Sequence, residues 1–154
     1  MTKKLTALLG FVLSFGFSSA AEIKLDFSTP EGAILVLEEA YKKKDIEAAV
    51  AAQDFFVQAK LMYINMGGGL EKDEDILKQT AEVLELSFRA QMKKEGFPNF
   101  DGLKSRFPKK ENYPKSKDVV EVTEVCTFPD GGESTQKILV AKTEKGWRVV
   151  IPTE

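Results

Sequence analysis

The chain contains no histidine and only one cysteine, Cys126. Without histidine to activate it, a thiol nucleophile at Cys126 is disfavoured, and a zinc site lacks its usual ligands. A single cysteine cannot form a disulfide within the chain, so stability has to come from packing. Cys126 lies in the strand-like segment VVEVTEVCTF. We therefore predict that it is a buried, unreactive residue.

The chain also lacks a surplus of basic residues. Its 22 lysines and arginines face 24 acids, which gives a formal net charge of −2. This balance gives no support to nucleic acid binding or to electrostatic attachment to anionic membranes. The acidic cluster at 71–75 lacks the glycine and the distal glutamate of a calcium loop, and acids are favoured in the first turn of a helix. We predict no metal site and no cofactor.

Residues 1–21, MTKKLTALLGFVLSFGFSSAA, have the pattern of a secretory signal peptide. Two lysines precede an apolar run from Leu5 to Phe17, and four small residues follow it. The run is shorter than the roughly 20 residues that span a bilayer. We expect cleavage after Ala20 or Ala21, no membrane attachment afterwards, and a periplasmic or secreted protein. Residues 22–154 then form a single domain.

The first half of that domain has helical patterns. Ser28, Thr29, Pro30 and Glu31 form a helix start, and the first helix should run from about residue 30 to 44. Two shorter helices should follow at about 46–53 and 54–63, and the three glycines at 67–69 should form a loop. The segment from Asp73 to Gly96 predicts a long amphipathic helix.

The last third changes to strand patterns. The segments DVVEVTEVCTF, STQKILVAKT and GWRVVIP are separated by turn sequences and predict a three-stranded antiparallel meander. Residues 97–117 predict an irregular connection with room for one edge strand. The fold class is therefore α+β, with N-terminal helices packed on one face of a curved antiparallel sheet. The strand face that should point at the helices carries Val120, Val122, Cys126 and Phe128.

The segments TPEGAILVLEEAYKKKDIEAAV and GWRVVIP resemble the nuclear transport factor 2-like superfamily, a cystatin-like cone fold, in its small exported bacterial form. The resemblance implies a cone that opens between the helices and the sheet. The superfamily includes enzymes, ligand carriers and immunity proteins, so the fold does not choose among these uses. Its enzymes often use histidine or aspartate, and this chain would need a buried carboxylate or a tyrosine instead. Asp54 is the best candidate base, but a helix cap is its favoured role, so we assign no catalytic residue.

We therefore expect an exported, non-catalytic binding module, either a monomer or a homodimer, that holds a small apolar ligand or a protein partner. The alternatives are a cofactor-free isomerase-like or cyclase-like enzyme, and an immunity protein that neutralises a toxin. Phe88 and Met92 lie four residues apart on one helix face, and Trp147 opens the strand that the resemblance places across the cone. We predict a ligand pocket between the long helix and the meander, lined by Phe56, Tyr63, Phe88, Met92 and Trp147.

Overall fold

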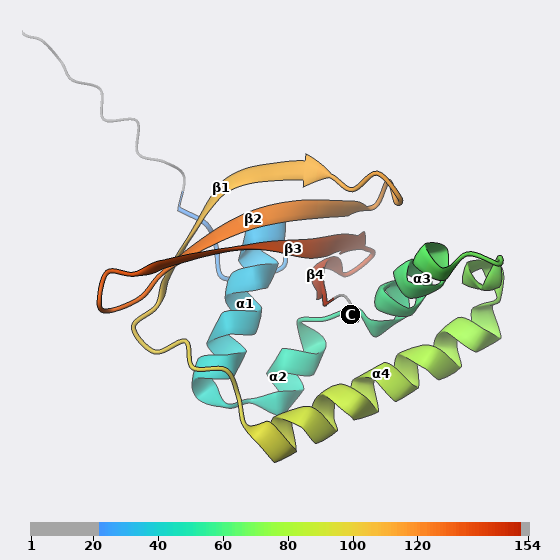
Figure 1. The fold of residues 1–154 in the computed structure, drawn as a ribbon, viewed down its shortest axis with the longest axis horizontal. Coiled ribbons are helices and arrows are strands. Elements are labelled where there is room, and N and C mark those ends of the chain that lie inside the picture. The colour runs from blue at the N-terminus through green and yellow to red at the C-terminus, as the bar shows by residue number, and fades with distance from the viewer. Residues whose placement is uncertain (1–21, 152–154) are drawn as a thin grey trace, which may run out of the picture.

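The computed structural model describes residues 22–151, so the predicted signal peptide lies outside the described residues. Four helices come first: α1 (Pro30–Lys43), α2 (Ile46–Ala51), α3 (Phe55–Met66) and α4 (Glu74–Glu95), with a 3-10 turn at Leu70–Lys72 before α4. Four strands follow: β1 (Lys104–Asn112), β2 (Val119–Thr127), β3 (Glu133–Thr143) and β4 (Gly146–Val150). They pair antiparallel in the order β1-β2-β3-β4 (Figure 1). The α+β class is confirmed, and this order of elements is the one that the resemblance implies.

Capping side chains explain where the helices begin. Thr29, Asp45, Asp54 and Asp73 each accept a hydrogen bond from a backbone N–H in the first turn of the helix that follows. Asp54 accepts from the Val57 N–H at 2.8 Å. The capping role expected for Asp54 is therefore confirmed.

The connection after α4 contains β1, which becomes the edge strand of a four-stranded meander. Pro108 lies within β1, and the pairing register of β1 with β2 shifts between Arg106 and Lys109. Proline has no N–H to donate, so it is tolerated on an edge strand next to such an irregularity. The proline-rich sequence is therefore compatible with a strand at this edge of the sheet.

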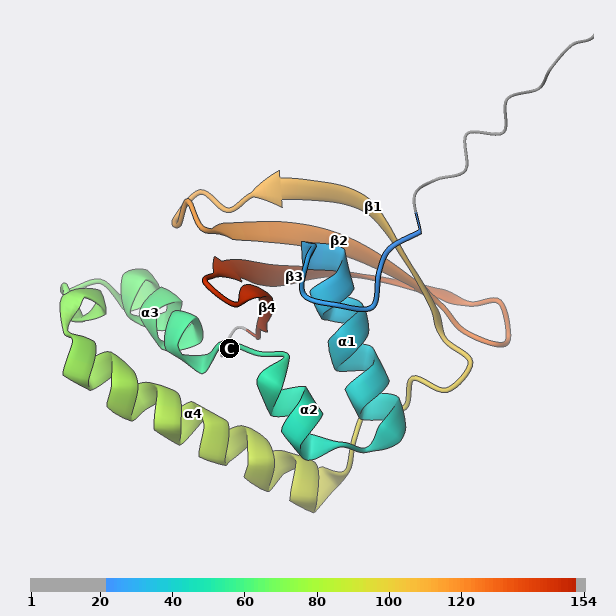
Figure 2. The ribbon, with the colours of Figure 1, turned by 180° about the vertical axis from the view of Figure 1, so that it is seen from behind.

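Helix α1 crosses one face of the sheet (Figure 2) and builds the main core with α2. On β2 the inward side chains of Val122 and Cys126 are buried, as predicted. Phe128 is 41% exposed, so its predicted inward position is wrong. The reason is that β2 ends at Thr127, and the Phe128 N–H already belongs to the following turn, where it donates to the carbonyl of Gly132.

A second, smaller core lies on α3. Leu61 packs there with Val119, Leu139, Ala141 and Val150. Because successive side chains of a strand point to opposite faces, these four strand residues lie on the face opposite to the strand residues of the main core. Helix α4 packs mainly against α3, with a smaller contact to α2. Figure 1 shows α2 and α3 between α4 and the sheet. Within residues 22–151 no helix is both long and apolar enough to cross a membrane.

Candidate functional site

A cavity of about 390 Å³ lies between α1 and the sheet. Its size and composition suit a small ligand, because binding sites usually combine apolar walls with a few polar groups. Two of its polar groups are the carboxyls of Glu38 and Glu124, and Gln136 and Lys137 also line it. The remaining wall comes from α1, from the segment after α4 and from strands β3 and β4, through Ile34, Leu37, Tyr41, Pro98, Phe100, Ile138, Val149, Val150 and Ile151.

The two carboxyls come from elements far apart in the sequence. Glu38 lies on α1 four residues after Ile34, so it shares the helix face that covers the sheet, and it is 5% exposed. Glu124 lies on β2 between the inward residues Val122 and Cys126, and it is fully buried. The Ser105 hydroxyl donates to Glu38 Oε1 at 2.7 Å, and the Gln136 amide donates to Glu124 Oε2.

The pair shares one proton at neutral pH. Burial, reinforced by the adjacent Glu124, raises the pKa of Glu38 to about 8. Burial alone would raise the pKa of Glu124 as well, but hydrogen bonds from Glu38 and Gln136 outweigh it and lower that pKa. Glu124 Oε1 is buried and has no hydrogen-bond partner among the described residues. At neutral pH Glu38 is therefore mostly protonated beside the Glu124 carboxylate, so the pair carries one negative charge.

Two other ionisable groups near the cavity remain protonated. Burial raises the pKa of Tyr41 to about 12, and its ring packs against Phe97 and Phe100 with centroid distances of 6.1 and 5.7 Å. Burial and the charge on Glu124 raise the pKa of the Cys126 thiol to about 11. Cys126 is thus a protonated, buried thiol at neutral pH, whereas a nucleophilic cysteine would need a lowered pKa.

The five pocket residues expected from the sequence lie elsewhere. Phe88 packs on Phe55 at a centroid distance of 6.0 Å, and Tyr63 shares a hydrogen bond of 2.9 Å with Thr80 between α3 and α4. Met92 and Trp147 are partly buried against the main core, and Phe56 is 36% exposed. None of the five lines the α1 cavity. A ligand-binding role for them stays a prediction.

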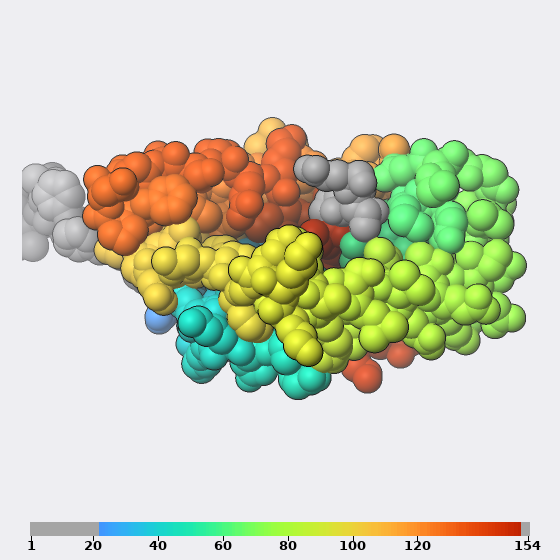
Figure 3. All heavy atoms as spheres, turned by 60° about the horizontal axis from the view of Figure 1, so that its bottom comes forward, coloured from blue at the N-terminus to red at the C-terminus, as the bar shows by residue number. Residues whose placement is uncertain are grey.

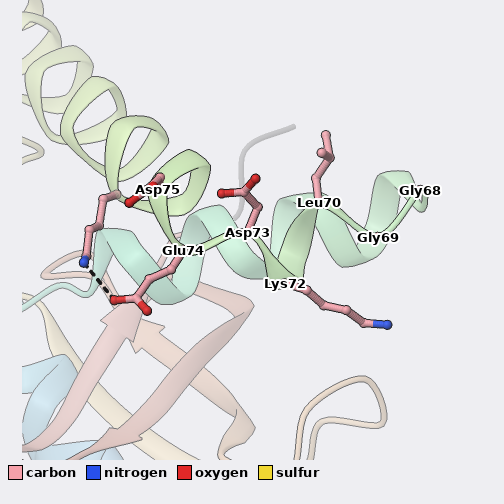
Figure 4. Close-up of a pocket in the computed structure, with 8 residues that line it drawn as sticks. Gly68, Gly69, Leu70, Lys72, Asp73, Glu74 and Asp75 are labelled. Atoms are coloured by element: carbon pink, nitrogen blue, oxygen red, sulfur yellow. Dashed lines mark ion pairs between the residues drawn. The ribbon is translucent and has the colours of Figure 1, made fainter.

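The acidic cluster at the start of α4 borders a shallow hollow of about 670 Å³ (Figure 4). The figure shows the carboxylates of Asp73, Glu74 and Asp75 pointing in different directions. Asp73 caps α4, and Glu74 pairs with Lys78 at 2.8 Å. Among residues 22–151 no three or more potential metal ligands converge on one point. The cluster therefore serves the helix start.

Sequence reasoning missed both members of the carboxyl pair. One signal for Glu124 was available, since it occupies an inward position in the alternation Val120, Val122, Glu124, Cys126. A charged residue on the buried face of a strand indicates a partner or a functional site. Glu38 gave a weaker signal, because Glu39 beside it is just as acidic and only the helix phase separates the two.

No protein-family model matches the sequence, and no curated protein matches it. A similar solved structure is a Campylobacter jejuni protein that is described as a candidate NTF2-like transpeptidase. The two chains are 15% identical, with a TM-score of 0.41, and the match covers 80% of this chain and 99% of the other.

Proposed function

We propose that this protein is exported and binds a small, mainly apolar molecule in the cavity between α1 and the sheet. The observation that carries this proposal is an apolar-walled cavity with a buried carboxyl pair in its wall. Apolar walls supply affinity, and the few buried polar groups fix the orientation of the ligand. The superfamily resemblance adds support, because it implies a cone in this place.

The negative charge of the carboxyl pair limits which ligands can bind in the cavity. Glu38 and Glu124 together carry one negative charge, and Lys137 at the rim is already paired with Glu121 at 2.7 Å. An anionic ligand would therefore meet repulsion in a poorly hydrated site. The ligand that fits is neutral or cationic and presents an amine or hydroxyl group as a donor to the pair.

Binding of 1-aminoanthracene, an apolar dye with a donor amine, tests the proposal by fluorescence titration. Ile138→Trp should fill the cavity from β3 and weaken dye binding about tenfold or more. Phe128→Trp, on an exposed turn, is the control and should leave binding unchanged. Normal binding in Ile138→Trp combined with a loss in Tyr63→Ala would contradict the proposal and favour the pocket expected from the sequence.

A cofactor-free enzyme is the second candidate, and the pKa of Glu38 favours it. Two adjacent carboxyls with separated pKa values supply an acid and a base in one site. Glu38 would donate a proton below about pH 8 and accept one above it. Ring opening of 5-nitrobenzisoxazole, which needs only a base, should then accelerate with a midpoint near pH 8. A rate equal to that in buffer, or a rate in Glu38→Gln equal to that of the wild type, would contradict catalysis by Glu38. Ligand binding without catalysis would then remain as the proposed function.

A further inference from the structure

The outer face of α4 exposes apolar side chains in the middle of the helix. Val83 is 60% exposed and Leu86 is 66% exposed, although α4 is otherwise polar on this side. Figure 3 shows α4, in yellow-green, running uncovered across the near face of the molecule. The exposed position Ala90 continues the stripe with a small side chain. An exposed apolar stripe on an otherwise polar helix face is typical of a protein–protein contact.

The stripe is symmetric about the centre of the helix. Helix α4 runs from Glu74 to Glu95, and Val83 and Leu86 lie equally far from its two ends. If a second α4 lies antiparallel with the two centres aligned, Val83 of each copy meets Leu86 of the other, and Gln79 meets Ala90. These positions follow the spacing of three and four residues that forms a helix-packing seam.

The charges on this face obey the same symmetry. Acids occupy the first turn of α4 and lysines the last. In the antiparallel arrangement Asp75 of one copy lies opposite Lys94 of the other, and the pair occurs twice. Among the described residues Asp75, Lys93 and Lys94 form no salt bridge within the chain. A parallel arrangement would instead place acids against acids and lysines against lysines.

We propose that this face binds a second copy of the chain, with the two α4 helices antiparallel around a twofold axis between Val83 and Leu86. The contact is isologous, because each copy offers the same patch. One pair of helices about 33 Å long buries less than the roughly 1,600 Å² of a standard interface. We therefore expect a reversible dimer whose population depends on concentration.

Sedimentation velocity on the chain from residue 22 tests this, over concentrations from about 5 to 500 μM, with dimer expected to accumulate at the upper end. Leu86→Glu places a carboxylate from each copy against Val83 of the other and should raise the dissociation constant about 100-fold or more. Phe128→Glu, an exposed apolar residue outside α4, is the control and should leave it unchanged. Circular dichroism shows whether each variant is folded.

A charge exchange tests the antiparallel register. Asp75→Lys and Lys94→Asp should each weaken the dimer about tenfold, because the twofold axis creates each repulsion twice. The double variant restores two opposite-charge pairs and should recover most of the loss. A chain that stays monomeric throughout the range overturns the proposal. So does a dimer that survives Leu86→Glu, or a double variant no better than the singles.

Discussion

Glu38→Gln should make the protein more stable than the wild type at about pH 9, by about 3–5 kcal/mol, and change stability near pH 5 by less than about 1 kcal/mol. The pKa of Glu38 is about 8 in the folded protein against an ordinary value of 4.5. The folded state therefore holds a proton that the unfolded chain releases, so wild-type stability falls as pH rises from about 4.5 through 8. Glutamine does not titrate, and its amide can still donate to Glu124 and accept from Ser105.

Urea unfolding at a series of pH values measures this effect. The lowered pKa of Glu124 has the opposite sign, because its contribution is present above its ordinary pKa and is lost as pH falls through the folded value. Wild-type stability should thus peak on the mildly acidic side. Glu39→Gln is the matched control, since Glu39 is the neighbouring residue and its one salt bridge among the described residues is to Lys43, at 3.3 Å on the surface. Parallel pH profiles for Glu38→Gln and the wild type would show that Glu38 is ionised at neutral pH.

The helices and the meander could be predicted because their signals are local. A capping side chain satisfies N–H groups within its own first turn, as Asp54 does for α3, so neighbouring residues are enough to place a helix start. Turn sequences likewise separate β2, β3 and β4. The edge strand β1 was harder, because Pro108 counts against a strand unless its edge position is known.

The cavity could not be predicted because it depends on tertiary packing. Phe88 and Trp147 have patterns that indicate burial, and both are partly buried against the core. Burial does not say which surface a side chain meets. Figure 1 shows α2 and α3 between α4 and the sheet, and α4 packs mainly against α3. The cavity forms on α1 instead, where the walls come from five separate stretches of the chain.

The carboxyl pair illustrates the same limit at the level of single residues. Glu38 and Glu124 are two of 24 acids, and no local motif joins them. The two carboxyls come together, and can share a proton, only once α1 has packed across β2. Strand alternation marks Glu124 as inward, and helix phase marks Glu38 as facing the sheet, but each signal becomes informative only once the other is known. The pair can therefore be recognised only from the folded structure.

Gly146→Ala should lower the free energy of unfolding by about 2–4 kcal/mol, because two costs add at this position. Gly146 begins β4 with φ of 96°, in the left-handed region that favours glycine. A Cβ added there would lie 2.6 Å from the Phe27 carbonyl oxygen. That oxygen accepts a hydrogen bond of 2.9 Å from the Trp147 N–H, which ties the segment before α1 to the sheet. The clash with backbone therefore has to displace this segment.

Gly131→Ala separates the two costs that act at Gly146. Gly131 lies in the turn between β2 and β3 with φ of 88°, and an added Cβ there meets nothing within 4 Å. Gly131→Ala therefore has only the conformational cost of a left-handed φ, about 1 kcal/mol. Thermal or urea unfolding measures the free energy of unfolding of both variants. The difference between their losses is the cost of displacing Phe27 from its contact with the start of β4. Equal losses in the two variants would mean that the contact between Phe27 and Gly146 adds nothing to the fold, and that the segment before α1 is held by its other contacts.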